Sequence, residues 1–293
     1  MFKILDRKDL ATSIKQFVID APLVAKKAKP GQFVIIRIKE GGERIPLTIA
    51  DFDAQKGTIT IVFQEVGKTT KELGTLKAGD YLTDFVGPLG EPVDFPNHKK
   101  VLGIGGGLGI APLYPKLKYL KEKGVEVTSI IGARSADLLF MEDEIEAVSD
   151  RMFVCTDDGS KGRHGFVTVV LKELLEQGEK FDEIIIIGPP ILMKIGSEIT
   201  RPFGIPTMVS LNPIMVDGTG MCGCCRVTVG GETKFACVDG PAFDGHKVDF
   251  DELIKRLQTY RDEEQIALEK HEGGSCRCHQ IFRLVPRVPS GLP

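Results

Sequence analysis

The first third of the chain alternates short apolar runs with turn residues. The runs are "SIKQFVIDAP", "GQFVIIRI", "RIPLTIADFD", "GTITIVFQEVG" and "GDYLTDFVGPLG", and Gly, Pro or Asp separates them at regular spacing. Short apolar segments between such turns are typical of antiparallel strands that close into a small barrel. We therefore expect residues 1–97 to form an antiparallel β-barrel.

The pattern changes at Lys99, where apolar strands begin to alternate with helical periodicity. "KKVLGIGGGLG" indicates a strand opening into a glycine loop, and "IAPLYPKLKYLKEKG" follows as a helix ending at Gly124. Four further strands, "VEVTSIIGARS", "RMFVCTDDGS", "FDEIIIIGPP" and "IPTMVSLN", each follow a helical segment. This alternation predicts a five-stranded parallel α/β domain over residues 98–210, with helices on both faces of the sheet.

The remaining chain divides into a cysteine-rich lobe over 211–247, a charged helix over 248–272 and a tail over 273–293. The tail lacks periodicity, and its "LVPR" resembles a protease-recognition linker, so part of it is expected to be foreign to the native chain. We assign no role to Cys276, Cys278 and His279, which lie in this tail.

Composition narrows the possible functions. The formal net charge of −3 over 293 residues, without a Lys/Arg cluster, predicts no nucleic-acid partner. The apolar runs are too short to span a membrane, and "MFKILDRKDL" lacks the apolar core of a signal peptide. We therefore expect a cytoplasmic protein with reduced thiols, in which clustered cysteines indicate metal or redox chemistry.

The glycine loop "GIGGGLGIAP" is a candidate nucleotide site. It departs from the strict dinucleotide fingerprint, because Leu108 or Ile110 stands at the third glycine position, and Arg134 rather than an acidic residue ends the next strand. Alone, the loop also suits a tight strand-to-helix turn. However, "TDDG" and "GPP" end two other strands at the same carboxyl edge, where such sheets bind ligands. The candidate nucleotide-binding residues are Gly105, Gly106, Gly107, Gly109, Arg134, Asp157, Asp158, Gly159, Gly188 and Pro189.

Two stretches of the first domain, "RIPLTIAD" and "EVGKTTKELGTLKAGDYLTDFVGPLG", resemble the ferredoxin–NADP reductase superfamily. In that superfamily a barrel holds a flavin and an α/β domain brings the nicotinamide to it. The resemblance implies FAD contacts at Pro46, Leu47 and Thr48, and a pyrophosphate site at Gly67, Lys68, Thr69 and Thr70. Arg44 is a further phosphate candidate, but it precedes Thr48 by four residues where the pattern has three. A bulge near Pro46 would be needed to restore its face.

The stretch "MVDGTGMCGCCRVTV" resembles the [2Fe–2S] lobe of the dihydroorotate dehydrogenase electron-transfer subunit. That lobe has the pattern Cys-x4-Cys-x2-Cys with a fourth Cys further on. Here the frame is Asp217-x4-Cys222-x2-Cys225-x11-Cys237, so the resemblance implies these four as cluster ligands. Zinc bound by the three cysteines and His246 remains an alternative. A second alternative is a Cys222/Cys225 dithiol that binds no metal. In a third, Asp217 is only a turn residue, and Cys224 or an external group is the fourth cluster ligand.

Together these resemblances imply an electron-transfer flavoprotein subunit containing FAD, a [2Fe–2S] cluster and an NAD(H) site. We identify no catalytic nucleophile or acid–base pair, so the cofactors would perform the chemistry. Arg134 or Arg163 could meet a 2′-phosphate, so the preference for NAD(H) over NADP(H) is open. The implied partner is a larger iron–sulfur/flavin subunit in a heterodimer or larger complex.

Two enzyme families are implied by this organisation. Asp217 favours the small subunit of the NADH-dependent ferredoxin:NADP oxidoreductases, also described as sulfide dehydrogenases, over the dihydroorotate dehydrogenase subunit. A zinc-binding interaction module is the alternative from another class, and such a protein would be colourless.

Overall fold

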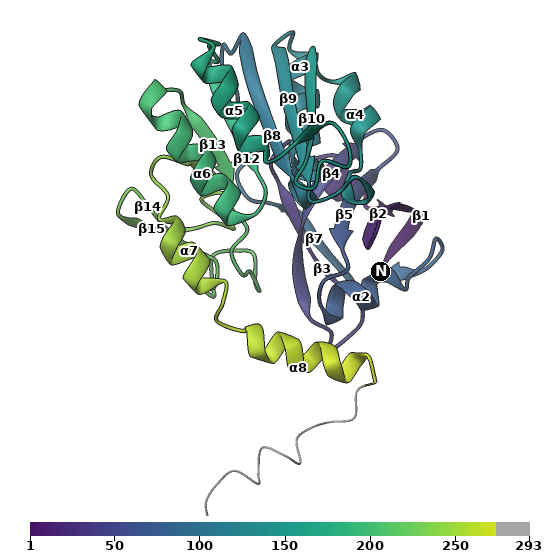
Figure 1. Ribbon diagram of the computed structural model, residues 1–293. Helices are drawn as coiled ribbons and strands as arrows, with labels where there is room; N and C mark the ends of the chain where they lie inside the picture. Colours follow the sequence, from purple (N-terminus) through teal and green to yellow (C-terminus); the bar gives the residue numbers. More distant parts are fainter. Residues whose placement is uncertain (274–293) are drawn as a thin grey trace, which may run out of the picture.

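The computed structural model describes residues 1–273, which form two seven-stranded sheets, a small hairpin and the helices that cover them (Figure 1). Cys276, Cys278 and His279 lie outside the described residues. Within that range, none of the helices has the length and apolarity needed to cross a membrane.

The first sheet is antiparallel and has the strand order β6-β1-β2-β5-β4-β3-β7. Its strands are β1 (Phe2–Ala11), β2 (Ile14–Asp20), β3 (Phe33–Arg37), β4 (Arg44–Asp53), β5 (Thr58–Gln64), β6 (Tyr81–Leu82) and β7 (Asp84–Leu89). The short helices α1 (Pro22–Ala25) and α2 (Lys68–Gly74) belong to the same region. Most of its buried residues, among them Phe17 and Phe63, form a core of their own. The expected antiparallel barrel is confirmed.

Strand β1 was absent from the sequence prediction. Only Ile4 of this strand is fully buried, and most of its remaining side chains are exposed or half-buried. A strand with one buried position shows little hydrophobic alternation, so its pattern carries a weak signal. Backbone pairing with β2 and β6, rather than an apolar face, places it in the sheet.

The second sheet has the order β11-β10-β9-β8-β12-β13-β16. Its strands are β8 (Lys100–Gly106), β9 (Glu126–Ala133), β10 (Arg151–Thr156), β11 (Arg163–His164), β12 (Glu183–Ile187), β13 (Thr207–Ser210) and β16 (Ala242–Asp244). The five predicted strands pair in parallel, as expected, and the short β11 continues the parallel array at one edge. At the other edge β16, which comes from the cysteine lobe, pairs antiparallel with β13.

Helices cover both faces of this sheet (Figure 1). They are α3 (Ile110–Glu122), α4 (Glu142–Ala147), α5 (Val167–Glu176) and α6 (Pro190–Thr200), with single 3₁₀ turns at Gly107–Gly109, Ala136–Leu138 and Arg201–Phe203. Alternate residues of β12 therefore enter different cores. Ile184 and Ile186 pack with residues of α5, whereas Ile185 and Ile187 pack with residues of α3. This two-sided burial explains why the strand reads as an uninterrupted apolar run.

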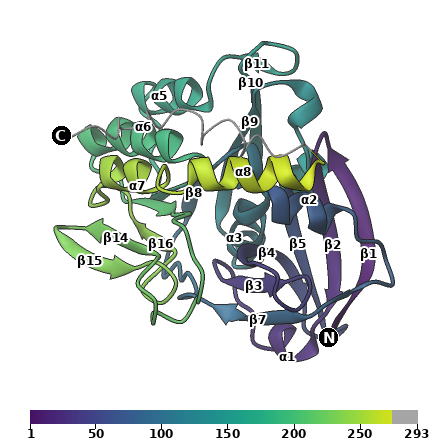
Figure 2. The same ribbon diagram turned by 90° about the horizontal axis from the view of Figure 1, so that it is seen from below.

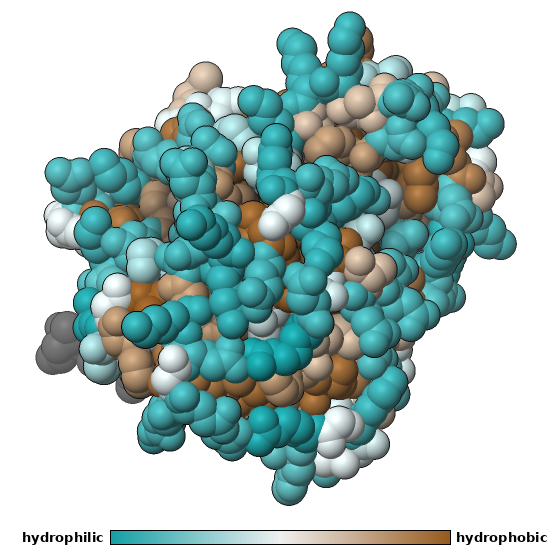
Figure 3. All heavy atoms as spheres, turned by 90° about the horizontal axis from the view of Figure 1, so that it is seen from above, coloured by the Kyte–Doolittle hydropathy of each residue, from teal (hydrophilic) through white to brown (hydrophobic). Residues whose placement is uncertain are grey.

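Seen from above, the molecule presents mainly hydrophilic side chains, with apolar residues visible in small patches between them (Figure 3). The larger apolar surfaces are inside. One core joins Phe33 and Ile35 of the barrel, residues of the parallel sheet, and Cys225 and Cys237 of the cysteine lobe. All three regions are therefore held by shared hydrophobic packing.

The cysteine lobe contains the hairpin β14 (Arg226–Val229) and β15 (Glu232–Phe235), and two helices follow it. The prediction of a single helix over 248–272 is wrong, because this segment forms two helices, α7 (Phe250–Arg256) and α8 (Arg261–His271). The Thr259 hydroxyl donates to the Arg256 carbonyl at 2.7 Å, and this local bond favours a turn over a continuous helix. Helix α8 then runs across the molecule to α2, where Lys71 forms an ion pair with Glu272 (Figures 1 and 2).

Candidate cofactor sites

A cavity of about 930 Å³ lies where the barrel, the carboxyl edge of the parallel sheet and the cysteine lobe meet. Many of the residues predicted to bind FAD or nucleotide line this one cavity. They are Pro46, Leu47 and Thr48 from β4, Gly106, Gly107 and Gly109 from the glycine loop, and Arg134, Asp157, Gly188 and Pro189 from three other strand ends. Its lining is largely apolar, which suits aromatic rings with a few placed polar groups.

The glycine loop connects β8 to α3 and leaves little space on its inner side. A Cβ atom at Gly109 would lie 2.2 Å from the carbonyl oxygen of Ile187 at the end of β12, so only glycine fits this close approach. Gly105 does not line the cavity: it faces Ile110 at the start of α3 and serves helix packing. Gly107 differs, because a Cβ there would meet no other atom within 4 Å. The loop thus presents bare backbone to the cavity, the feature that a close pyrophosphate requires.

The "TDDG" segment divides between the cavity and its own turn. Asp157 lines the cavity, and burial raises the pKa of its carboxyl while the Arg134 charge lowers it. Asp158 instead accepts hydrogen bonds from the Ser160 N–H at 2.9 Å and hydroxyl at 2.6 Å. Gly159 occupies the turn with φ of 75°. Asp158 and Gly159 therefore shape the turn that holds Asp157 in place.

The predicted pyrophosphate turn lies beside the cavity and does not line it. The Thr70 hydroxyl oxygen accepts hydrogen bonds from the N–H groups of Val66 at 3.1 Å and Gly67 at 3.0 Å, and this fixes the turn before α2. Glu43 faces the same turn. Its carboxylate accepts from the Thr69 hydroxyl and lies 3.5 Å from the Lys68 ammonium. The Lys68 ammonium and the Thr69 hydroxyl thus face one carboxylate here, which shows that they are oriented to bind an anionic group.

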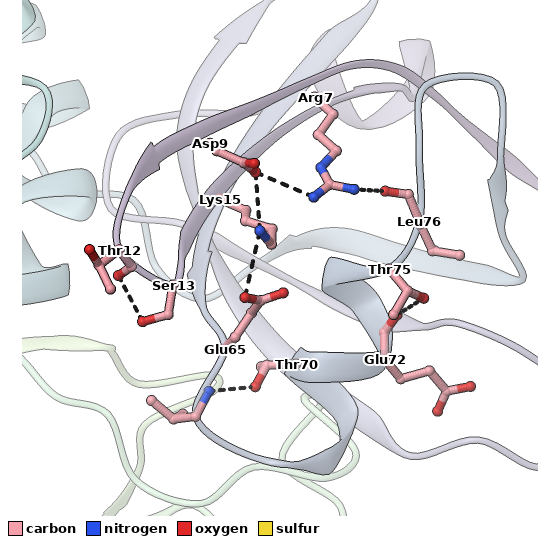
Figure 4. Close-up of polar contacts among 11 residues, drawn as sticks. Arg7, Asp9, Thr12, Ser13, Lys15, Glu65, Thr70, Glu72, Thr75 and Leu76 are labelled. Atoms are coloured by element: carbon pink, nitrogen blue, oxygen red, sulfur yellow. Dashed lines mark hydrogen bonds and ion pairs between the residues drawn. The ribbon is translucent and has the colours of Figure 1, made fainter. Parts of the chain in front are cut away.

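A network of charged side chains connects the segment before this turn to the β1–β2 hairpin (Figure 4). The Lys15 ammonium on β2 lies 3.1 Å from Asp9 on β1 and 3.6 Å from Glu65, which directly follows β5. The Glu65 N–H also donates to the Ser13 carbonyl at 2.9 Å. Both ends of Glu65 are therefore anchored to the β1–β2 hairpin, so the segment leading into the turn has a fixed direction.

Arg44 points elsewhere than the resemblance implies. Strand β4 pairs with β3 in regular register from Arg44 to Thr48, so there is no bulge near Pro46 to turn Arg44 toward the phosphate site. The irregularity lies further on, between Ile49 and Asp51, on the side of β5. Arg44 and Thr48 consequently share one face of the strand. The Arg44 guanidinium reaches the cysteine lobe rather than the turn before α2.

In the cysteine loop, one pair of predicted ligands already lies together. The Sγ atoms of Cys225 and Cys237 are 3.1 Å apart and both side chains are buried. Burial, followed by the contact with Cys225, raises the pKa of the Cys237 thiol well above its ordinary value. The Gly220 N–H donates to the Cys237 sulfur at 3.1 Å. Two convergent sulfurs with an N–H donor form a suitable half-site for an iron–sulfur cluster.

The other two predicted ligands lie on the outer part of the loop. Cys222 is exposed, and hydrogen bonds from backbone N–H groups, first of Cys224 and then of Asp217, lower the pKa of its thiol. The Asp217 Oδ2 accepts from the Thr219 N–H at 2.9 Å, the Thr219 hydroxyl at 2.5 Å and the Met221 N–H at 3.4 Å. Asp217 therefore stabilises the turn through Oδ2, which is the role that the turn-residue alternative gives it. Its other carboxylate oxygen, Oδ1, is left to bind a metal.

These positions suit a two-iron cluster better than a single metal ion. Within the described chain, no three His, Cys, Asp or Glu side chains come together around one ion position. His246, the proposed zinc ligand, instead places Nε2 2.9 Å from the Thr200 hydroxyl beside α6. A [2Fe–2S] cluster needs its four protein ligands as two pairs, one for each iron. Cys225 and Cys237 form one such pair, and Cys222 and Asp217 are the two donors left for the second iron, so the donor set fits the cluster.

Sequence reasoning missed several residues that line the cavity. They include Phe33, Gln64, Phe166 and the segment from Ser210 to Pro213, together with Met215 and Pro241. The segment "LNPIM" directly follows β13, so it occupies the same carboxyl edge as the glycine loop. Its position at the end of a predicted parallel strand was the feature of the sequence that could have identified it as part of the site. Met215 is also only two residues from Asp217, so the cavity extends to the cysteine loop.

Two family models match parts of the chain. Residues 104–198 match the oxidoreductase NAD-binding domain. Residues 212–249 match the iron-sulfur cluster binding domain of dihydroorotate dehydrogenase B. The first range contains the glycine loop and the second contains the four predicted cluster ligands.

Whole-chain comparisons agree with these matches. A Thermotoga maritima protein, a dihydroorotate dehydrogenase B (NAD(+)) electron transfer subunit homolog, is 52% identical, with 92% of this chain and 94% of the relative covered. The dihydroorotate dehydrogenase B (NAD(+)) electron transfer subunit of Geobacillus thermodenitrificans is 35% identical, covering 84% and 96%. A chain of the NADH-dependent reduced ferredoxin-NADP oxidoreductase, a structure solved to study flavin-based electron bifurcation, superposes with a TM-score of 0.87 at 51% identity. This alignment covers 92% of this chain and 97% of that chain.

Proposed function

Because the chain belongs to the family of dihydroorotate dehydrogenase B electron transfer subunits, we propose that it carries electrons between NAD(H) and a partner subunit. One observation supports this most strongly. Thr48 of the barrel, Gly107 of the nucleotide sheet and Met215 beside the cysteine loop all line the same cavity. The three regions needed for flavin, nicotinamide and cluster therefore meet at one place.

The residues around the cavity divide the task of holding the cofactors. We propose that Pro46, Leu47 and Thr48 hold the flavin ring, and that the turn from Gly67 to Thr70 holds the FAD pyrophosphate. Nicotinamide nucleotide binds along the glycine loop, between Arg134 and Asp157 on one side and Gly188 and Pro189 on the other. Asp217, Cys222, Cys225 and Cys237 hold the [2Fe–2S] cluster. When bound, FAD exchanges a hydride with nicotinamide and single electrons with an iron–sulfur cluster.

The protein's own contribution is orientation and exclusion of water. The apolar lining from Phe33, Leu211 and Met215 keeps water from the space between the barrel and the cysteine loop. Gly109, pressed against Ile187, fixes the glycine loop relative to the sheet edge. No proton-transfer residue is required of the chain, so its site consists of shape, backbone N–H groups and a few charges.

For the partner we propose a larger subunit that contains iron–sulfur or flavin groups, in an NADH-dependent ferredoxin:NADP oxidoreductase complex. The superposition on a chain of such an enzyme and the carboxylate at position 217 support this assignment. The named relatives support a dihydroorotate dehydrogenase complex as the second candidate. We place the subunit in the cytoplasm, because a cluster site built from thiols needs a reducing compartment.

The test is cofactor analysis of protein purified without oxygen. We expect one FAD and one [2Fe–2S] cluster per chain, and bleaching of the flavin absorbance by NADH. Stoichiometric zinc without iron or acid-labile sulfide would refute the cluster, and equal bleaching by NADPH would refute the preference for NAD(H). Co-purification of the native complex, with identification of its second chain, separates the two candidate partners.

A further inference from the structure

Arg44 joins the flavin barrel to the cysteine loop. It lies at the start of β4, on the same strand face as Pro46 and Thr48, which line the central cavity. From there its Nε donates to the Val216 carbonyl at 3.2 Å, and its Nη2 donates to the Asp217 carbonyl at 3.3 Å. One planar guanidinium thus binds two successive carbonyl groups of a segment more than 170 positions away in the chain.

The guanidinium is held from the barrel side as well. Asp84 on β7 lies 3.9 Å from Arg44 Nη1 and pairs with Arg37 Nε at 2.6 Å. The Arg44 side chain is 31% exposed and that of Asp84 is 28% exposed, so water screens this arrangement less than it screens a surface pair. Arg44 therefore occupies a defined position between the barrel and the loop.

The two acceptors stand where the cluster frame begins. Asp217 is the first ligand position of that frame, and its carboxylate turns back onto Thr219 and Met221 within the same loop. The hydrogen bonds to the Val216 and Asp217 carbonyls fix the orientation of the main chain where the cysteine loop passes the barrel. Arginine is always protonated, so it also places a permanent positive charge next to Asp217.

We propose that Arg44 is a positioning residue for the cluster loop, setting both the main-chain geometry at Asp217 and the reduction potential of the cluster. This inference rests on the proposed function, since it requires a cluster in the loop. Adding an electron makes the cluster more negative, and a fixed positive charge nearby stabilises that reduced form. Arg44 consequently acts on the cluster and not on the FAD phosphates.

The experiment compares Arg44→Met, Arg44→Lys and the matched control Lys39→Met, all in the full chain purified without oxygen. Lys39 lies in the connection between β3 and β4, just before Arg44, and pairs with Glu72 on α2. Its loss therefore removes an equal charge away from the loop. Three quantities are measured: the midpoint potential of the cluster by electron paramagnetic resonance, the FAD content, and hydrogen exchange of the amides from 217 to 221.

Arg44→Met should lower the equilibrium constant for reducing the cluster about tenfold, equivalent to about 59 mV for one electron. It should also speed amide exchange in the loop, with FAD content unchanged. Arg44→Lys keeps the positive charge but cannot form both hydrogen bonds to the Val216 and Asp217 carbonyls. The cluster potential of this variant should therefore lie closer to the wild-type value than its amide exchange rates do. Lys39→Met should match the wild type in all three measurements.

Two results would overturn the inference while leaving the proposed function intact. One is a cluster with unchanged potential and unchanged loop exchange in Arg44→Met. The other is loss of FAD from Arg44→Met with an unaltered cluster, which would return Arg44 to the phosphate role that the resemblance implies. Wild-type protein that contains no iron or sulfide would instead refute the proposed function, and this inference with it.

Discussion

Gly218 of the cysteine loop packs directly against Ile35 of strand β3. A Cβ atom at position 218 would lie 2.8 Å from the Ile35 Cγ1 and 3.0 Å from the Leu89 Cδ1 on β7. Gly218 also has φ of 86°, a conformation that other residues rarely adopt. The loop therefore approaches the barrel as closely as a backbone can.

This contact predicts that Gly218→Ala destabilises the loop by more than its backbone strain alone. Gly231→Ala is the matched control, because Gly231 has φ of 82° with no atom within 4 Å of its would-be Cβ. Both changes should cost about 1 kcal/mol for the left-handed conformation. Gly218→Ala should cost roughly 1–3 kcal/mol more from overpacking. Thermal unfolding and iron content measure the difference, and equal effects of the two variants would contradict the tight packing.

The glycine loop allows a similar comparison for the nucleotide. Gly107 and Gly124 lie at opposite ends of the segment containing α3, both with positive φ and both with open space at the would-be Cβ. Alanine at either position should therefore affect stability equally. Only Gly107→Ala places a methyl group in the cavity, so it should raise the NADH concentration for half-maximal flavin bleaching roughly tenfold, or about 1.4 kcal/mol. An equal change in Gly124→Ala would disprove the nucleotide assignment of this loop.

Asp217 is predicted to ligate iron. Asp217→Cys should retain a [2Fe–2S] cluster with all-thiolate ligation and a lower potential, because thiolate donates more electron density to iron than carboxylate. Asp217→Ala should lose or weaken the cluster while FAD remains, because the flavin seat lies in the barrel. Visible and electron paramagnetic resonance spectra report both outcomes.

Cys224→Ala is the control for that experiment and should keep the cluster. Cys224 is only half-buried, and its carbonyl accepts from Arg256 on α7 at 3.1 Å, an interaction that the substitution leaves in place. Cluster loss in Cys224→Ala, together with unaltered spectra in both Asp217 variants, would identify Cys224 as the fourth ligand instead.

Glu183 should make stability depend on pH. Burial raises the pKa of its carboxyl to about 7 from an ordinary 4.5, and Asp244 adds to the shift, while His98, with Nε2 3.3 Å away, opposes it. The folded chain thus prefers the protonated form. Its contribution is complete below pH 4.5 and is lost as the pH rises through 7, a change on the order of 3 kcal/mol.

Glu183→Gln should therefore remove part of the loss of thermal stability between pH 5 and pH 8. The expected gain at pH 8 is on the order of 5 °C in apparent Tm relative to the wild type. Glu126→Gln makes the same chemical change on an exposed residue of β9, which β8 separates from β12, and serves as the control. Parallel pH profiles of wild type and Glu183→Gln would contradict the assignment.

The sequence predicted the two sheets because their apolar periodicity follows directly from burial. Ile184 to Ile187 are all buried between two layers of helices, and such an uninterrupted apolar run is typical of a strand in a parallel sheet. Strand β1 escaped prediction because pairing, not burial, holds it. The resemblance indicated an iron–sulfur lobe, and the match of residues 212–249 to an iron–sulfur cluster binding domain supports that lobe. The choice of Asp217, Cys222, Cys225 and Cys237 as its ligands stays a prediction.

The direction of Arg44 could not be predicted from the sequence. It depends on whether β4 is regular between Arg44 and Thr48, and a one-residue bulge would leave the same letters pointing to the opposite face. The place of Leu211, Asn212, Pro213 and Met215 in the cavity lining could not be predicted either. They line the cavity only because the chain turns past the sheet edge after β13. This tertiary relationship leaves no periodic pattern in the sequence.

Strand β16 covers what would otherwise be the open margin of the nucleotide sheet, pairing from Met208 with Asp244 to Ser210 with Ala242. An uncovered margin offers unpaired N–H and C=O groups to any other chain with a free strand. The lobe that holds the predicted iron ligands thus also protects the sheet from self-association. We expect oxidative damage that unfolds this lobe to produce aggregates, rather than a free nucleotide-binding domain.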